Sequence, residues 1–119
     1  MSNRFASCDE YGLRHLPRHL LHGERWRKIE QLLTDFDFLE VKCSKGMVYD
    51  LLQDFALAKE RRGLLSVAQM REALALELSN LASRPEFAVQ LVYNRLAWFE
   101  DPEPILREQL ETARSKLNR

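Results

Sequence analysis

The sequence has few of the residues that interrupt, cross-link or anchor a fold. Among 119 residues it has four glycines, four prolines and two cysteines. Two cysteines without CxxC spacing form no disulfide framework, which excludes a small disulfide-stabilised domain. No apolar stretch approaches the roughly 20 residues that a membrane-spanning helix needs. Sequences typical of phosphate-binding loops, dinucleotide folds and hydrolase nucleophiles are also missing, so no motif indicates an enzyme.

An excess of one charge is missing as well. Lysine plus arginine and aspartate plus glutamate number 18 each, so the chain has no net charge at neutral pH. Nucleic-acid partners usually require a basic excess, and this class is therefore disfavoured. Residues 1–5 contain no apolar signal region. We expect a cytoplasmic protein that uses no cofactor, contacts no membrane and forms a single domain over residues 1–119.

The abundant residues favour helix. Leucine, alanine, glutamate and arginine are common, whereas valine, isoleucine and threonine are scarce. Capping boxes are expected at Ser7–Glu10 and at Ser66–Gln69. Apolar spacing predicts helices over about residues 8–22, 24–34, 36–44, 47–62, 66–81, 85–99 and 101–117. Because the connections are short, the prediction is an all-α domain of stacked antiparallel helical hairpins, superhelix-like, with about seven helices.

The histidines lie together in the first predicted helix. His15, His19 and His22 follow one another at i, i+4 and i+7, which places them along one helix face. Imidazoles in that arrangement can share a zinc or copper ion. A catalytic zinc site usually adds a carboxylate or water, but Glu24 lies past the turn and Cys43 is remote in sequence, so we expect polar interface residues and no bound metal. A histidine-based metal protein stays an alternative.

The first hairpin is also locally basic. Arg14, Arg18 and Arg25 are followed by Arg27 and Lys28. Such a patch can contact the phosphates of a nucleic acid or an acidic protein surface. The balanced charge of the whole chain favours a solvated or protein-contacting face. A small helical regulator that binds nucleic acid through this hairpin is the second alternative.

Aromatic residues supply further candidates for partner contact. Trp26 and Trp98 share helical stripes with Ile29 and Leu91, which predicts that both tryptophans belong to the core. Phe99 departs from its stripe and is expected to be an exposed contact. The candidate binding residues are therefore Arg14, Arg18, Arg25 and Phe99.

Several leucine-rich motifs carry a family resemblance. They are Tyr11 with His15-Leu16-Pro17 and His19-Leu20, the run Leu32-Leu-Thr-Asp-Phe-Asp-Phe-Leu39, Lys42, Leu81-Ala-Ser-Arg-Pro85, Gln90-Leu91 and the helix around Leu110–Ala113. In this order, over residues 9–117, they resemble the helical arm of signalling ATPases akin to apoptotic protease-activating factor. That arm lies between the nucleotide-binding (NB-ARC) and winged-helix part and the WD-repeat propeller.

The resemblance implies a scaffold or inter-domain arm without catalytic residues. It also implies a packing signature formed by Tyr11, Leu16, Pro17, Leu20, Leu32, Leu33, Phe36, Phe38 and Leu39. The chain itself contains neither a phosphate loop nor a WD repeat. We therefore expect either an excised arm or a stand-alone protein of the same fold, which binds a partner protein or neighbouring domains of a longer chain, or forms a homo-oligomer through an uncapped apolar face.

Overall fold

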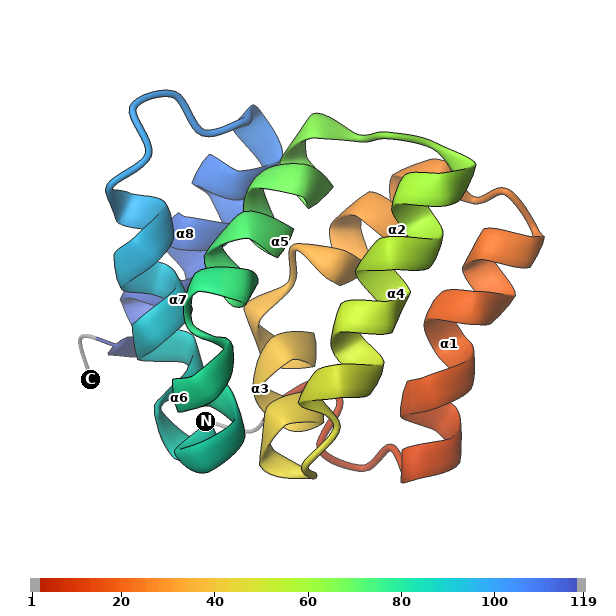
Figure 1. The fold of residues 1–119 in the computed structure, drawn as a ribbon, viewed down its shortest axis with the longest axis horizontal. Helices are drawn as coiled ribbons and strands as arrows, with labels where there is room; N and C mark the ends of the chain where they lie inside the picture. The colour runs from red at the N-terminus through yellow and green to blue at the C-terminus, as the bar shows by residue number, and fades with distance from the viewer. Residues whose placement is uncertain (1–2, 118–119) are drawn as a thin grey trace.

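Helices carry almost the whole path of the chain in the computed structural model, which describes residues 3–117 (Figure 1). Within that range the structure contains helices and turns but no strand, which confirms the predicted all-α fold of about seven helices. The elements are α1 (Glu10–His22), α2 (Trp26–Leu33), α3 (Phe36–Ser44), α4 (Val48–Arg61), α5 (Leu65–Leu76), α6 (Leu78–Ser83), the 3-10 helix η1 (Pro85–Phe87), α7 (Ala88–Ala97) and α8 (Pro104–Leu117).

Three predicted boundaries differ from the observed ones. The predicted fifth helix is divided at Glu77 into α5 and α6. The predicted sixth helix starts as the 3-10 turn η1 and becomes α-helical only from Ala88. The last helix begins at Pro104 and not near Asp101, because a residue that precedes proline is biased away from helical geometry and proline is tolerated in a first turn.

The two predicted capping boxes are wrong. The N-cap of α1 is Asp9, whose Oδ1 accepts a hydrogen bond from the Gly12 backbone N–H at 2.7 Å. Ser66 lies inside α5 instead of before it, and its hydroxyl donates to Glu30 Oε2 at 2.5 Å, which joins α5 to α2. Ser66 is fully buried, and a buried hydroxyl group is usually hydrogen-bonded. The bond to Glu30 satisfies that requirement.

The core gathers around α5, which contacts α2, α4, α6, α7 and α8. Helix α1 covers α2 and α4 on one side, and α8 packs on α5 and α7 on the other (Figure 1). The largest fully buried apolar side chains are Phe38, Phe55, Leu13, Ile29, Leu39, Leu51, Met70, Leu74, Leu81, Leu96 and Leu106. The body measures 36 × 32 × 26 Å. Among residues 3–117, none of the helices combines the length and hydrophobicity that crossing a bilayer requires.

Most of the predicted packing signature lies inside. Its buried members are Pro17, Leu32, Leu33, Phe36, Phe38 and Leu39, and its half-buried members are Leu16 and Leu20. Tyr11 was wrongly placed in this set, since 70% of it is exposed. It sits in the first turn of α1, and its ring lies 4.1 Å from the His15 ring, centroid to centroid. The aromatic pair covers the surface of α1 and does not contribute to the core.

Candidate functional site

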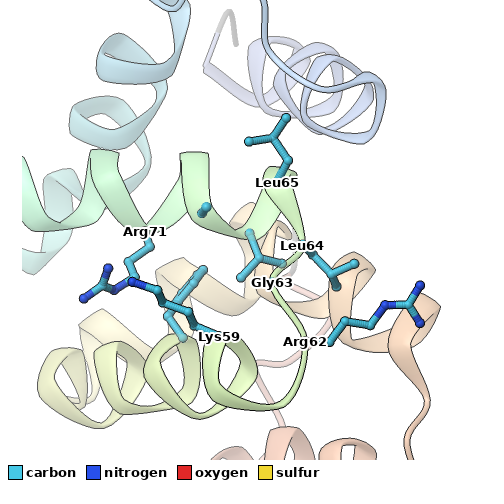
Figure 2. Close-up of a pocket in the computed structure, with 9 residues that line it drawn as sticks. Lys59, Arg62, Gly63, Leu64, Leu65 and Arg71 are labelled. Carbon is cyan, nitrogen blue, oxygen red and sulfur yellow. The ribbon is translucent and has the colours of Figure 1, made fainter.

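An apolar pocket opens at the corner where α4 passes into α5 (Figure 2). Its volume is about 240 Å³. The residues that line it are Phe55, Lys59, Arg62, Gly63, Leu64, Leu65, Val67, Ala68 and Arg71. We refer to it as the α4–α5 pocket. Most of the residues that line it are apolar or contribute the aliphatic stems of long side chains.

The local backbone creates this space. Helix α4 ends at Arg61, and Arg62 and Leu64 adopt extended conformations before α5 begins at Leu65. The pocket lies beside this short connection between the two helices. Phe55 and Val67 are buried at the base of the pocket, whereas 59% of Leu65 is exposed at its edge. The exposed apolar surface of the pocket is therefore supplied by residues at its edge, such as Leu65 and Ala68.

The charge around the pocket has a single sign. Lys59, Arg62 and Arg71 line it together with apolar residues, and no acidic side chain does. Within residues 3–117, none of these three cations takes part in an ion pair. Lys59 and Arg71 project toward the same end of the pocket, and Arg62 points to the other side (Figure 2). The Arg62 guanidinium carbon lies 5.8 Å from the centroid of the Trp26 ring.

The arginines predicted for partner binding do not gather at this pocket. Arg14 Nε lies 3.6 Å from Asp50 Oδ1, and one terminal nitrogen of Arg18 lies 3.3 Å from the same oxygen. Their charge is thus compensated within the chain, which leaves Arg25 as the one of the three that forms no ion pair within residues 3–117. Arg25 lines a separate pocket with His19, Leu20, His22, Gly23 and Lys28. In the basic first hairpin, Arg14 and Arg18 therefore form ion pairs within the chain, whereas Arg25 lines a surface pocket.

The two adjacent aromatics at the end of α7 exchange their predicted roles. Trp98 was expected in the core, but 87% of it is exposed. Phe99 was expected at the surface, but it is half-buried and packs against the core. Helix α7 ends at Ala97, and helical spacing loses its meaning beyond that residue. Trp98 is the most exposed of the large apolar side chains in residues 3–117.

The histidines and cysteines are not arranged as a metal or nucleophile site. His15, His19 and His22 are all exposed along α1. In the described part of the chain, no three His, Cys, Asp or Glu side chains are grouped so that they could hold a metal ion. Burial raises the pKa of the Cys43 thiol to about 12, against a smaller opposing effect of Lys42. Its thiolate, the reactive form, is not populated at neutral pH.

A buried charge cluster lies between α1, α3 and α4. Lys42 Nζ donates to Asp50 Oδ2 and to Asp54 Oδ2, each at 2.6 Å. Lys42 and Asp54 are both fully buried, and Asp50 connects them to Arg14 and Arg18 at the surface. The Lys42 ammonium also lies 5.3 Å from the centroid of the Phe38 ring. This cluster fixes three helices to one another and offers no open space for a substrate.

Stability should depend on pH through Asp54. Burial is the main cause that raises the pKa of Asp54 from 3.8 to about 6, and hydrogen bonding and attraction by Lys42 oppose the shift. Asp54 Oδ1 is also buried without a hydrogen-bond partner in residues 3–117. Between about pH 4 and 6 the folded chain then binds more protons at Asp54 than the unfolded chain does. The contribution of Asp54 to the free energy of unfolding therefore falls as pH rises through that window, by up to about 3 kcal/mol.

The matched comparison for this prediction is Asp54→Asn. The variant does not titrate at this position, while Asp37, with its lowered pKa, is present in both proteins. We expect wild type to gain stability relative to Asp54→Asn as pH is lowered from 7 to 4, measured by urea unfolding at each pH. A difference that stays constant over that range would show that the pKa of Asp54 is not raised.

Comparison with protein-family models, with curated proteins and with solved structures finds no match for this chain. The resemblance to a signalling-ATPase arm therefore stays a prediction. The residues that sequence reasoning missed are Lys59, Arg62 and Arg71 at the pocket and the exposed Trp98. Lys59 and Arg62 lie in a basic run that ends at Gly63, which was a usable signal. The position of Arg71 depends on how α5 packs against α4, and no local pattern indicates it.

Proposed function

We propose that the chain is a non-enzymatic helical scaffold that binds another protein, or a neighbouring domain, through the α4–α5 pocket. The observation that supports this is a pocket with exposed apolar residues at its edge, next to three cations that form no ion pair within residues 3–117. At about 240 Å³ the pocket is smaller than the roughly 300 Å³ at which pockets begin to bury drug-sized molecules. It suits the anchoring side chain of a protein partner.

The resemblance found in the sequence fits this role. The helical arm of a signalling ATPase works through contacts between domains and performs no chemistry of its own. We accordingly propose that the chain supplies such contacts in an assembly with NB-ARC and WD-repeat proteins. A reducing compartment such as the cytoplasm suits Cys8 and Cys43, which are both free.

Site-specific photo-crosslinking tests the docking role directly. A photoreactive residue replaces Ala68, which lines the pocket, in the full chain expressed in its own cells. The matched control carries the same residue at Ala82, which is exposed on α6. We expect discrete protein adducts from position 68 and none from position 82, since only the first lies in the pocket.

Charge reversal of the pocket edge completes the test. Lys59→Glu with Arg71→Glu should remove the adducts from position 68 if the partner is acidic where it meets this edge. Both side chains are exposed, so the fold should tolerate the changes. Equal adduct yields at positions 68 and 82, or no adducts at position 68, would overturn the proposal that the pocket is a docking site.

A further inference from the structure

One segment of the chain has the chemistry that the α4–α5 pocket would select. Residues 98–103 read Trp-Phe-Glu-Asp-Pro-Glu, so an aromatic residue is followed by three carboxylates. Trp98 is 87% exposed and therefore does not occupy the pocket of its own chain. Glu100 and Asp101 are exposed as well. We call this stretch the Trp98 segment.

We propose that the α4–α5 pocket binds the Trp98 segment of a second copy of this chain, an inference that rests on the proposed docking role of the pocket. The Trp98 indole enters the apolar space, and the carboxylates of Glu100 and Glu103 contact the cations at the pocket edge. Tryptophan is the residue type most enriched among side chains that dominate binding energy at interfaces. Charge complementarity of this kind also orients the approaching surfaces.

The Trp98 segment is held in place before any contact forms. Gln69 of α5 donates from Nε2 to the Asp101 carbonyl oxygen at 3.3 Å and accepts from the Glu103 backbone N–H at 3.0 Å. Phe99 packs against the core next to the exposed Trp98. A fixed segment loses less conformational entropy on binding than a mobile one. The backbone next to the indole is therefore held in place, although the indole itself is almost fully exposed.

The other exposed aromatics match the pocket less well. Tyr11 follows Asp9 and Glu10, but its ring already stacks on His15 and the Asp9 side chain caps α1. Tyr49 precedes Asp50, whose carboxylate is engaged by Lys42 and two arginines. Phe87 follows only one carboxylate, Glu86. In the Trp98 segment Asp101 pairs with Arg107 at 2.8 Å, but Glu100 and Glu103 form no ion pair within residues 3–117, so a free large side chain is combined there with two available carboxylates.

The proposed contact joins different surfaces of two copies. The pocket lies between α4 and α5, whereas the Trp98 segment connects α7 to α8. If two copies bind each other reciprocally, the dimer is isologous; otherwise the contact is heterologous and either closes into a ring or continues as a chain of copies. In each case one intact pocket and one intact Trp98 segment suffice for one contact. That property gives a test by complementation.

Sedimentation velocity over micromolar to millimolar concentrations measures the association. The average mass of wild type should rise with concentration and fall with added salt, since exposed charges are screened. Trp98→Ala should weaken association by about 30-fold or more, as expected for a hot-spot residue. Lys59→Glu with Arg71→Glu should weaken it comparably. The controls Tyr11→Ala and Arg84→Glu change an exposed aromatic and an exposed cation elsewhere and should behave as wild type.

Mixing the two weakened variants tests whether the pocket of one copy binds the Trp98 segment of another. Trp98→Ala keeps its pocket, and the charge-reversed variant keeps its Trp98 segment, so an equimolar mixture should associate more strongly than either variant alone. Wild type that remains monomeric over the whole range, or a mixture that stays as monomeric as its parts, would overturn the inference. If adducts to another protein still form at position 68, the proposed function stands and only the self-association fails.

Discussion

Lys42→Met should lower the free energy of unfolding by about 3–5 kcal/mol at neutral pH, the range expected when one member of a buried ion pair is removed. Lys42 is fully buried and donates to Asp50 and Asp54 at 2.6 Å each. Methionine keeps much of the volume of the lysine stem but offers no donor. Asp54 would then be left buried without its cation, a state that costs more than the pair itself contributes. Urea unfolding, monitored by circular dichroism, measures the loss.

The double variant Lys42→Met with Asp54→Leu distinguishes a lost ion pair from a lost shape. Removing both charges eliminates the unpaired carboxylate, so the double variant should recover most of the stability that Lys42→Met alone loses. The deficit of Lys42→Met should also shrink as pH is lowered, because loss of the cation raises the pKa of Asp54 further and the carboxyl becomes neutral. A double variant as unstable as Lys42→Met would show that the lysine stem, and not its charge, stabilises this region.

The fold was largely predictable because helix formation is local. Leucine spacing, the scarcity of β-branched residues and the positions of glycine place most helices within a few residues of where they lie. The errors occur where tertiary contacts decide the outcome. Ser66 lies in a favourable capping pattern but is buried, and its hydroxyl bonds to Glu30 on another helix. The sequence around Ser66 gives no indication that Glu30 is its hydrogen-bond partner.

The candidate site was less predictable because it depends on which charges are left over after folding. Arg14 and Arg18 form a basic patch in the sequence, yet Asp50 compensates both in the fold. Lys59 and Arg71 lie 12 positions apart and come together only because α4 and α5 meet at Gly63. The exposure of Trp98 follows from the end of α7 at the preceding residue. A helical stripe extended past that end gives the opposite prediction.

The buried charge cluster around Lys42 and the α4–α5 pocket have different consequences for a binding role. In the charge cluster around Lys42, cations and carboxylates pair with one another and connect α1, α3 and α4, so the cluster is a structural element. The α4–α5 pocket leaves cations and apolar atoms without partners in the described chain, so binding to another surface can add favourable contacts there. A change in the first feature should therefore affect stability, and a change in the second should affect association with little effect on stability.

Phe38→Ala should lower the free energy of unfolding by about 3–5 kcal/mol, the range for deleting a large aromatic side chain from a core. Phe38 is 1% exposed, its ring lies edge-on to Phe5 with centroids 5.4 Å apart, and the Lys42 ammonium lies over it. Both contacts are lost with the ring, together with the dispersion contacts around the cavity that remains. The measurement is again urea unfolding, with the slope against denaturant checked for a change in the unfolded state.

Tyr11→Ala provides the contrast within the same predicted packing signature. Because 70% of Tyr11 is exposed, its removal should change the free energy of unfolding by no more than about 0.5 kcal/mol. Phe38→Leu should fall between these two, since leucine refills part of the cavity. Equal losses for Phe38→Ala and Tyr11→Ala would contradict the packing around α3. The predicted order separates the residues of the packing signature that this chain buries from the one that it exposes.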